Sequence, residues 1–363
     1  MESKFKKSNI INKNSSIFIV SFSLYKKGKR LPKNGMIEPM ISFFAPKVKT
    51  LLLVDQPHPL SDTINPLIEK YQNAKQIKKY SLSAFLYFPI YLYCLMERKG
   101  LTRISYKLRD FFSVIFMALT QKGNYDLFIG LEAINALAGI ILRKLGKVEI
   151  VVYYVSDYSP NRFSKFGKKL FNTLYLWLDR FCVLHADFTW DVSSAMQEGR
   201  LKNGLNSEKK YRVIHVHNGL FPSQIRSLPI SKRTPNSLVY LGTLEPDFGV
   251  ELAIKALKEV KRKNPKSMLW IIGGGKELLI LKRLVQKLKL EKSVIFYGFV
   301  EDNNEVARIV RTSYISLAPY RAFPESLRWY GDAGKIRQYL AAGLPVVTTQ
   351  VPPLGRHIVE KGA

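Results

Sequence analysis

The stretch that decides the fold is residues 316–349, SLAPYRAFPESLRWYGDAGKIRQYLAAGLPVVTT. Its first half predicts a strand and a loop, Asp332 can cap a helix that runs through Ala342, and a second buried strand follows. The first-turn amides and the dipole of such a helix favour an anion. Lys335 lies in that first turn and Arg321 lies upstream, so a phosphate-bearing ligand fits best. The alternative is that Lys335 is an exposed, solvated lysine.

The composition indicates a folded chain with more than one domain. Its 363 residues are 47% hydrophobic and 12% aromatic, and they carry a formal charge of +29. Because the charges are spread along the chain, they indicate either a solvated lysine-rich surface or a face for phospholipid, nucleic acid or a phosphorylated substrate. Cys94 and Cys182 have neither metal-ligand nor disulfide-framework spacing, which favours a reducing cytoplasm.

Apolar runs alternate with helical segments along the whole chain. This alternation predicts an α/β fold in which two parallel sheets are covered by helices on both faces, as in Rossmann-like domains. The predicted order is a basic tail at 1–15, a first domain at 16–221, a proline-containing linker at 222–237 and a second domain at 238–363. Strands are expected at 17–23, 50–55, 126–131, 149–155, 188–192, 211–216, 238–242, 268–273 and 294–298.

Three polar features follow strands of the first domain, where a parallel sheet binds its ligands. The segment 26–35, KKGKRLPKNG, predicts a flexible basic loop, and it does not match the dinucleotide fingerprint GxGxxG. Glu132 is either a substrate residue or a carboxylate in the first turn of a helix. Asp157 either faces the ligand or forms an Asx turn.

The run 335–347, KIRQYLAAGLPVV, resembles the nucleotide-sugar segment of GT-B glycosyltransferases, especially those of family 4. In that family, a helix with a ribose-binding Glu ends in AxGxPVV. Gln338 takes the position of this Glu, and Tyr330 takes that of a second Glu. The runs LVYLGTLEPDFGVELAIKA, WIIGGGK and VIFYGFV resemble further donor-domain segments in the same order. The resemblance covers 238–347, whereas the first half matches only in architecture.

The resemblance implies two Rossmann-like domains that face each other across a cleft. It implies a metal-independent, typically retaining glycosyltransferase without a cofactor, which moves a sugar from a nucleotide-diphosphate donor to a glycan or lipid-linked acceptor. Surface polysaccharide or glycolipid synthesis would use such an activity. Family 4 commonly places Arg and Lys in the first donor-domain loop, where this chain has Thr243 and Phe248. The phosphate charge is therefore expected to meet Lys335 and Arg321 instead.

The site residues expected from this resemblance and from the strand ends fall into two groups. The donor-binding residues are Gly242, Thr243, Gly298, Phe299, Arg321, Asp332 and Gln338. The catalytic residues are Lys335, Asp157 and Glu132, and no metal ligand is expected.

Two aromatic runs, 84–96 and 111–119, are separated by several basic residues. The longer run falls short of the roughly 20 residues that cross a bilayer. The two runs can form buried core helices, or they can lie in the headgroup layer. The second reading predicts a cytoplasmic protein held on the inner face of the plasma membrane through residues 77–121.

Two other functions fit parts of the pattern. A nucleotide-sugar epimerase of GT-B architecture would act on the donor without an acceptor. A nonenzymatic binder of nucleic acid or of an anionic surface would account for the charge, although the lack of a nucleic-acid motif argues against nucleic acid. The chain stops where family members usually continue with helices that cross back to the first domain, so we expect the second domain to be incomplete.

Overall fold

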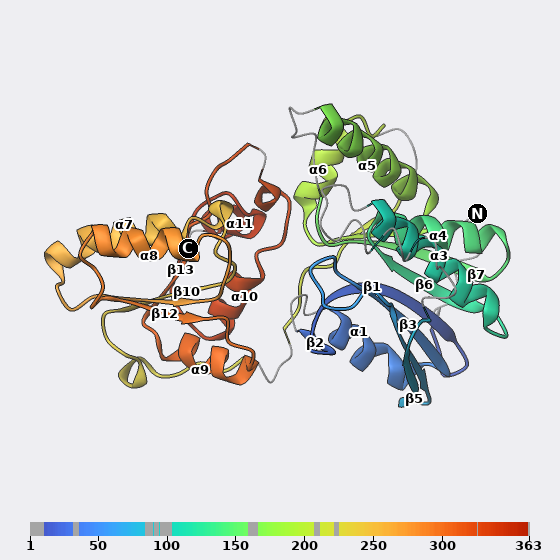
Figure 1. Cartoon of the computed structure of the whole chain (residues 1–363), viewed down its shortest axis with the longest axis horizontal. Coiled ribbons are helices and arrows are strands. Elements are labelled where there is room, and N and C mark those ends of the chain that lie inside the picture. The colour runs from blue at the N-terminus through green and yellow to red at the C-terminus, as the bar shows by residue number, and fades with distance from the viewer. Residues whose placement is uncertain are drawn as a thin grey trace. The chain divides into compact units, whose positions relative to one another are not determined.

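The computed structural model describes residues 11–31, 36–83, 90, 94, 104–158, 166–206, 211–220, 225–324 and 326–361. Most of the predicted basic tail and of the run 84–96 lies outside the described residues, as does the start of the predicted linker. The chain divides into two compact units. One unit runs to Val192 and includes Met196–His217, and the other comprises Ser193–Ala195 and the chain from Asn218 onward (Figure 1).

The first unit is built on one mixed sheet, in the order β5-β4-β3-β1-β6-β7-β8-β9, with β2 paired to β1. From β3 to β9 neighbouring strands are parallel, while β4 and β5 form an antiparallel edge. The strands are β1 Ser16–Lys26, β2 Lys29–Leu31, β3 Thr50–Pro57, β4 Leu67–Gln72, β5 Lys75–Ser81, β6 Tyr125–Leu131, β7 Val148–Val155, β8 Phe188–Asp191 and β9 Val213–His215. The central strands are buried on both faces, as their continuous apolar runs predicted.

The segment 26–35 is not the predicted loop in its described part. Strand β2 pairs antiparallel with β1 around a two-residue turn, in which Lys27 and Gly28 have φ angles of 49° and 69°. Positive φ at both central residues is the geometry of a type I′ hairpin, whose twist matches that of the strands. Arg30 then fixes the hairpin to the sheet, because its Nε lies 2.6 Å from the buried Asp55 carboxylate in β3. Residues 32–35 lie outside the described residues.

Several helices of the first unit lie within the described residues. They are α1 Ile37–Phe44, the short 3-10 helix η2 Ala45–Lys47, α3 Ile104–Thr120, α4 Ala133–Lys144, α5 Phe166–His185 and α6 Ser194–Lys202. Helix α4 packs on β6 and β7 and lies between α3 and α5, on one side of the sheet (Figure 1). No helix of the described ranges is both long and apolar enough to span a bilayer.

A buried ion network ties α5, α6 and β8 together. Arg200 donates to Asp179 at 2.8 Å and to Asp191 at 2.6 Å, and all three side chains are fully buried. The Tyr153 hydroxyl donates to Asp179 at 2.8 Å. Removing charges from water costs free energy that only close, well-oriented partners offset, so this network depends on all its members.

The second unit contains a five-stranded parallel sheet in the order β12-β11-β10-β13-β14. The strands are β10 Ser237–Leu241, β11 Met268–Ile272, β12 Val294–Gly298, β13 Ile315–Ala318 and β14 Val346–Thr348. The helices are α7 Val250–Lys263, α8 Leu278–Lys287, α9 Asn303–Thr312, α10 Gly334–Ala341 and α11 Pro353–Glu360, with 3-10 helices η5 Ile230–Lys232, η6 Pro246–Phe248 and η7 Leu327–Trp329.

Neighbouring residues of β10 point to opposite faces of this sheet, as the two-residue period of a strand requires. Val239 packs in a cluster with residues of α9 and α10, and Tyr240 packs in a second cluster with residues of α7 and α8. The two clusters bury both faces of the sheet, which confirms the predicted α/β architecture. Because the strands are parallel, their carboxyl ends lie along one edge of the sheet, together with the loops that follow them.

Candidate functional site

Glycine loops form the carboxyl edge of the second sheet. Gly242 follows β10 with φ 138°, and Gly273 follows β11 with φ 137°. The Gly242 amide donates to the Ile272 carbonyl at 2.9 Å, and the Gly273 amide donates to the Gly298 carbonyl at 2.7 Å. A Cβ on Gly273 would lie 1.9 Å from the Gly242 carbonyl oxygen. Only glycine allows these backbones to approach so closely, which leaves the edge open to a ligand.

Lys335 reaches this edge from the first turn of α10. Its Nζ donates to the Tyr240 hydroxyl at 2.9 Å and lies 4.0 Å from the centroid of that ring. It lies 4.5 Å from the Phe248 centroid and 5.1 Å from the Tyr320 centroid. A Cβ on Gly242 would come within 2.8 Å of it. We call the three rings around this ammonium, those of Tyr240, Phe248 and Tyr320, the aromatic box.

The alternative that Lys335 is an exposed, solvated lysine does not fit this structure. The side chain is half-buried, and its ammonium is enclosed by the aromatic box. Burial lowers the pKa of Lys335 well below its usual range, and the nearby charge of Arg328 lowers it further. Among the described residues, no carboxylate forms an ion pair with Lys335. An anion that bound here would supply the missing negative charge.

Arg321 reaches the same edge from the loop after β13, but it already has an acidic partner. Its guanidinium lies 3.1 Å from the Glu251 carboxylate in α7 and 4.3 Å from the Phe323 ring centroid. Its backbone amide donates to the Asp247 carbonyl at 3.0 Å. An entering phosphate must share Arg321 with Glu251, so Lys335 is the more available cation.

Asp332 does not cap α10, contrary to the sequence prediction. The helix begins at Gly334, and the N-cap position is held by Ala333 without a side-chain hydrogen bond. The Asp332 carboxylate instead accepts from Arg337 Nε at 2.9 Å and from the Asn218 amide at 2.8 Å. The reason is that the guanidinium of Arg337, five residues later, donates charge-assisted hydrogen bonds to this carboxylate. Such bonds are stronger than the hydrogen bond of a carboxylate to a backbone amide at a helix start. The first turn of α10 therefore has no side-chain cap, which leaves room for an external acceptor.

The remaining donor-binding candidates flank this edge. The Thr243 carbonyl accepts a hydrogen bond from the Tyr240 hydroxyl at 2.7 Å, which continues the chain that begins at Lys335. Gly298 ends β12 with φ 71°, and the next side chain, Phe299, is exposed beside the loop after β11. Gln338 is exposed on α10, one turn beyond Lys335. The second unit thus holds all the predicted donor-binding residues.

Glu132 stands at the carboxyl end of β6 in the first unit, with an unusual backbone. Its φ and ψ of 70° and 154° fall in a region that is essentially restricted to glycine and costs about 1–3 kcal/mol. Its carboxylate accepts from Ser156 Oγ at 3.2 Å and makes no capping bond to α4. Burial raises the pKa of Glu132, while the charge of Lys107 opposes this and that of Asp157 adds to it. The strained backbone thus holds a half-buried carboxylate at a strand end.

Asp157 follows the neighbouring strand β7 and is exposed. Its carbonyl accepts a hydrogen bond from the Tyr175 hydroxyl at 3.3 Å, and its charge acts on Glu132. The two predicted carboxylates of the first unit therefore lie at adjacent strand ends. Sequence reasoning missed the aromatic box and the Gly242–Gly273 contact; the only signal for them was the recurrence of glycine after apolar strands.

Comparison with known proteins bears on the family and the fold. Residues 224–363 match the family described as glycosyl transferases group 1. The solved structure of sucrose-phosphate synthase from Thermosynechococcus elongatus superposes with a TM-score of 0.63 at 14% identity, covering 94% of this chain and 82% of that one. The chain is a GT-B protein. Its α/β fold with two Rossmann-like domains is the one that the sequence predicted.

Two further GT-B relatives extend the comparison. Anabaena HepE, solved in complex with UDP, superposes with a TM-score of 0.58 at 16% identity over 92% of this chain and 80% of that one. Glycogen synthase from Mycobacterium tuberculosis is 29% identical over 126 residues, which are 35% of this chain. The match spans 28% of the length of that relative. These likenesses establish the fold.

Proposed function

We propose that this GT-B protein is a metal-independent, retaining glycosyltransferase of the family 4 type that uses a nucleotide-diphosphate sugar. The observation that carries the proposal is the Lys335 ammonium, which stands at the carboxyl edge of β10 and at the start of α10. An enclosed cation at the start of a helix that has no side-chain cap suits a dianionic diphosphate. The match of residues 224–363 to the group 1 glycosyl transferases supports the same reading.

In this mechanism, the bond from the sugar anomeric carbon to the diphosphate oxygen breaks, and the leaving diphosphate takes the electron pair. Lys335 and the dipole of α10 stabilise the charge that develops there. The acceptor hydroxyl forms the new bond on the same face of the sugar, and its proton passes to the leaving phosphate. We assign Glu132 and Asp157 to the acceptor side, where the half-buried Glu132 carboxylate can orient a hydroxyl.

The remaining contacts place the nucleotide. We assign the Thr243 amide to the diphosphate, while Gly242 leaves the space that Lys335 Nζ occupies and Arg321 adds a second cation. We assign the binding of the nucleotide base to Gly298 and Phe299, because the exposed Phe299 ring can stack on it. Gln338 is assigned to the ribose hydroxyls, and Asp332 to holding Arg337 beside the helix start. No metal or cofactor takes part in this proposal.

We propose a glycan or lipid-linked acceptor in surface polysaccharide or glycolipid synthesis, and action at the inner face of the plasma membrane. The support is the basic character of the chain, with a formal charge of +29, which attracts it to phosphorylated lipids and anionic bilayers.

A thermal-shift panel of UDP-, GDP-, ADP- and dTDP-sugars tests this function. A ligand at about 100 times its dissociation constant stabilises the folded protein by about 2.7 kcal/mol, so one nucleotide should raise the melting temperature clearly. If no member of the panel raises it, the proposal is wrong. Conversion of the bound donor into a different sugar nucleotide without any acceptor would instead identify an epimerase.

A further inference from the structure

Helix α5 has an apolar face that the described residues of the first unit leave exposed. Leu170, Leu174 and Trp177 are 62%, 59% and 55% exposed, and Phe171 stands beside them. Their spacing places them along one side of the helix. A surface helix normally presents polar residues there, and contiguous exposed apolar patches of this kind mark interaction sites.

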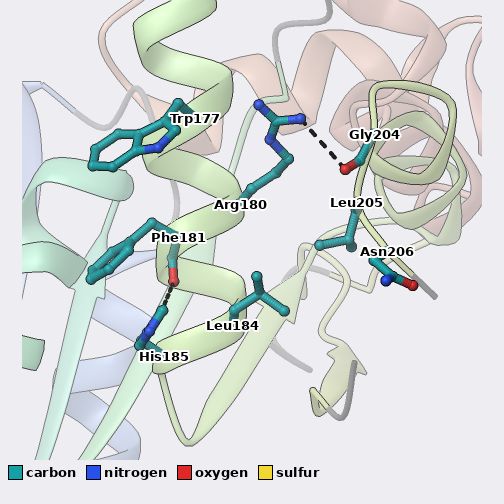
Figure 2. Close-up of a pocket in the computed structure, with 8 residues that line it drawn as sticks. All are labelled: Trp177, Arg180, Phe181, Leu184, His185, Gly204, Leu205 and Asn206. Atoms are coloured by element: carbon teal, nitrogen blue, oxygen red, sulfur yellow. Dashed lines mark hydrogen bonds between the residues drawn. The ribbon is translucent and has the colours of Figure 1, made fainter. Parts of the chain in front are cut away.

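The apolar face continues along α5 into a pocket. The Trp177 and Phe181 rings stack with centroids 5.8 Å apart, and Phe181 stacks on His185 at 4.0 Å. Figure 2 shows these three side chains along one side of α5, while Arg180 and Leu184 point toward residues 204–206. The pocket has a volume of about 240 Å³. Arg180 donates to the Asn203 carbonyl at 3.0 Å and brings a cation to its rim.

Helix α3 repeats the pattern in the same layer. Its exposed apolar side chains are Ile104, Leu108, Phe112 and Leu119. Since α4 lies between α3 and α5 on one side of the sheet (Figure 1), both exposed faces look away from that sheet. We call the outward sides of these three helices the α3–α5 face.

The charges on the α3–α5 face have one sign. In α3, α4 and α5 the acidic residues are Asp110 and Asp179, and both are buried against arginines. Lys107, Lys144 and Lys169 are exposed. An apolar surface with cations and without exposed acids complements an anionic partner that has an apolar interior. Two copies of the face would repel each other, so self-association is disfavoured.

We infer that the α3–α5 face binds the surface of an anionic phospholipid bilayer, with Leu170, Phe171, Leu174 and Trp177 entering the acyl boundary. The exposed lysines meet lipid phosphates, and the stacked rings lie at headgroup depth. The predicted membrane region, 77–121, overlaps this face only through α3, and residues 84–89, 91–93 and 95–103 of it lie outside the described residues. Helix α5, which the sequence did not single out, is the principal contact. The inference does not depend on the transferase activity.

Vesicle sedimentation of the whole chain tests the inference. The protein should bind vesicles of phosphatidylcholine with phosphatidylglycerol, bind pure phosphatidylcholine weakly, and dissociate as salt rises. The double variant L174S/W177S should bind the anionic vesicles about tenfold or more weakly, because two apolar side chains no longer enter the lipid. The matched control is L279S/I280S on α8, where the side chains are 68% and 60% exposed. It should bind like the wild type.

Intrinsic fluorescence gives a readout that does not depend on the folding of the double variant. Anionic vesicles should shift the tryptophan emission to shorter wavelength in the wild type, and Trp177→Phe should abolish most of that shift. Equal binding by L174S/W177S and the wild type, or equal binding to neutral and anionic vesicles, would overturn the inference. A third result would also overturn it: the wild type is a dimer that does not bind vesicles, and the L174S/W177S variant is a monomer.

Discussion

At the residue scale, the site depends on a lysine whose neighbours are aromatic rings. Cation–π contacts contribute up to about 2 kcal/mol when the cation is desolvated, and they offset part of the cost of burying Lys335. Burial and the charge of Arg328 lower the pKa of Lys335, so desolvation opposes these contacts. The unliganded protein thus holds a cation at a cost to stability, a trade-off that active sites often make.

Replacing this lysine by methionine should stabilise the unliganded protein. Lys335→Met keeps the length of the side chain and removes its desolvation cost. Because the folded-state pKa of Lys335 is lowered, the unfolded state binds more protons between that pKa and the ordinary lysine pKa, and wild-type stability rises with pH across this window. The gain from Lys335→Met should be largest below the lowered pKa and should vanish as the pH reaches the ordinary lysine range. Urea unfolding at several pH values measures it.

Lys282→Met is the matched control for this experiment. Lys282 is exposed on α8, and its ammonium lies 6.0 Å from the Phe296 ring centroid, so it makes a cation–π contact without burial. The control should show little change in the free energy of unfolding. A loss of stability in Lys335→Met at every pH would mean that the aromatic box holds the ammonium more tightly than water does.

Part of this site could be predicted from the sequence. Lys335 was found because a helix start after a strand and a loop is a local pattern. The aromatic box was missed because its rings come from β10, from η6 and from the residues after β13, and only packing of the sheet brings them together. The helix start was misplaced for a similar reason, since Asp332 is held by Arg337 and by the distant Asn218 amide.

At the scale of elements, the buried network of Arg200, Asp179 and Asp191 holds α5 and α6 to β8. Arg200→Leu would leave two carboxylates without their cation, and burial already raises the pKa of Asp191. We expect a loss of about 3–5 kcal/mol in the free energy of unfolding, measured by denaturant titration. The triple replacement of all three residues by apolar ones should recover much of this loss.

Arg143→Leu provides the comparison. Arg143 pairs with Asp187 at 2.5 Å, but both side chains are partly exposed. Its loss should cost at most about 1 kcal/mol, because water screens the pair and solvates the remaining carboxylate. Equal losses for Arg200→Leu and Arg143→Leu would show that the buried network contributes no more than a surface pair.

Three strands, β2, β4 and β5, were not predicted from the sequence, and two of them, β2 and β5, share a physical cause. Strand β5, KQIKKYS, is exposed along its whole length and rich in lysine, so it shows neither alternation nor an apolar run. Strand β2 has only three residues. Such strands form because a neighbouring strand offers free hydrogen-bonding groups, which no local pattern records. The buried parallel strands carry their own apolar signal, and all those predicted are present.

At the scale of the whole molecule, the two units carry different chemistry. The second unit holds the glycine edge, the aromatic box and the cations proposed for the donor. The first unit holds the strained Glu132, the neighbouring Asp157 and the α3–α5 face. The formal charge of +29 serves both, because the donor and an anionic bilayer are each negatively charged. The net charge in the sequence predicted that the protein attracts anions, but it did not say which unit binds which anion.

The central claim is that Lys335 binds the donor diphosphate, and isothermal titration tests it most directly. The titrant is the nucleotide sugar that raises the melting temperature most, added to wild type, Lys335→Met and Lys282→Met. A hydrogen bond to a charged group contributes about 1.5–3 kcal/mol, so Lys335→Met should bind about 10- to 150-fold more weakly, while Lys282→Met should match the wild type. Unchanged affinity in Lys335→Met, with its fold intact by circular dichroism, would contradict the account.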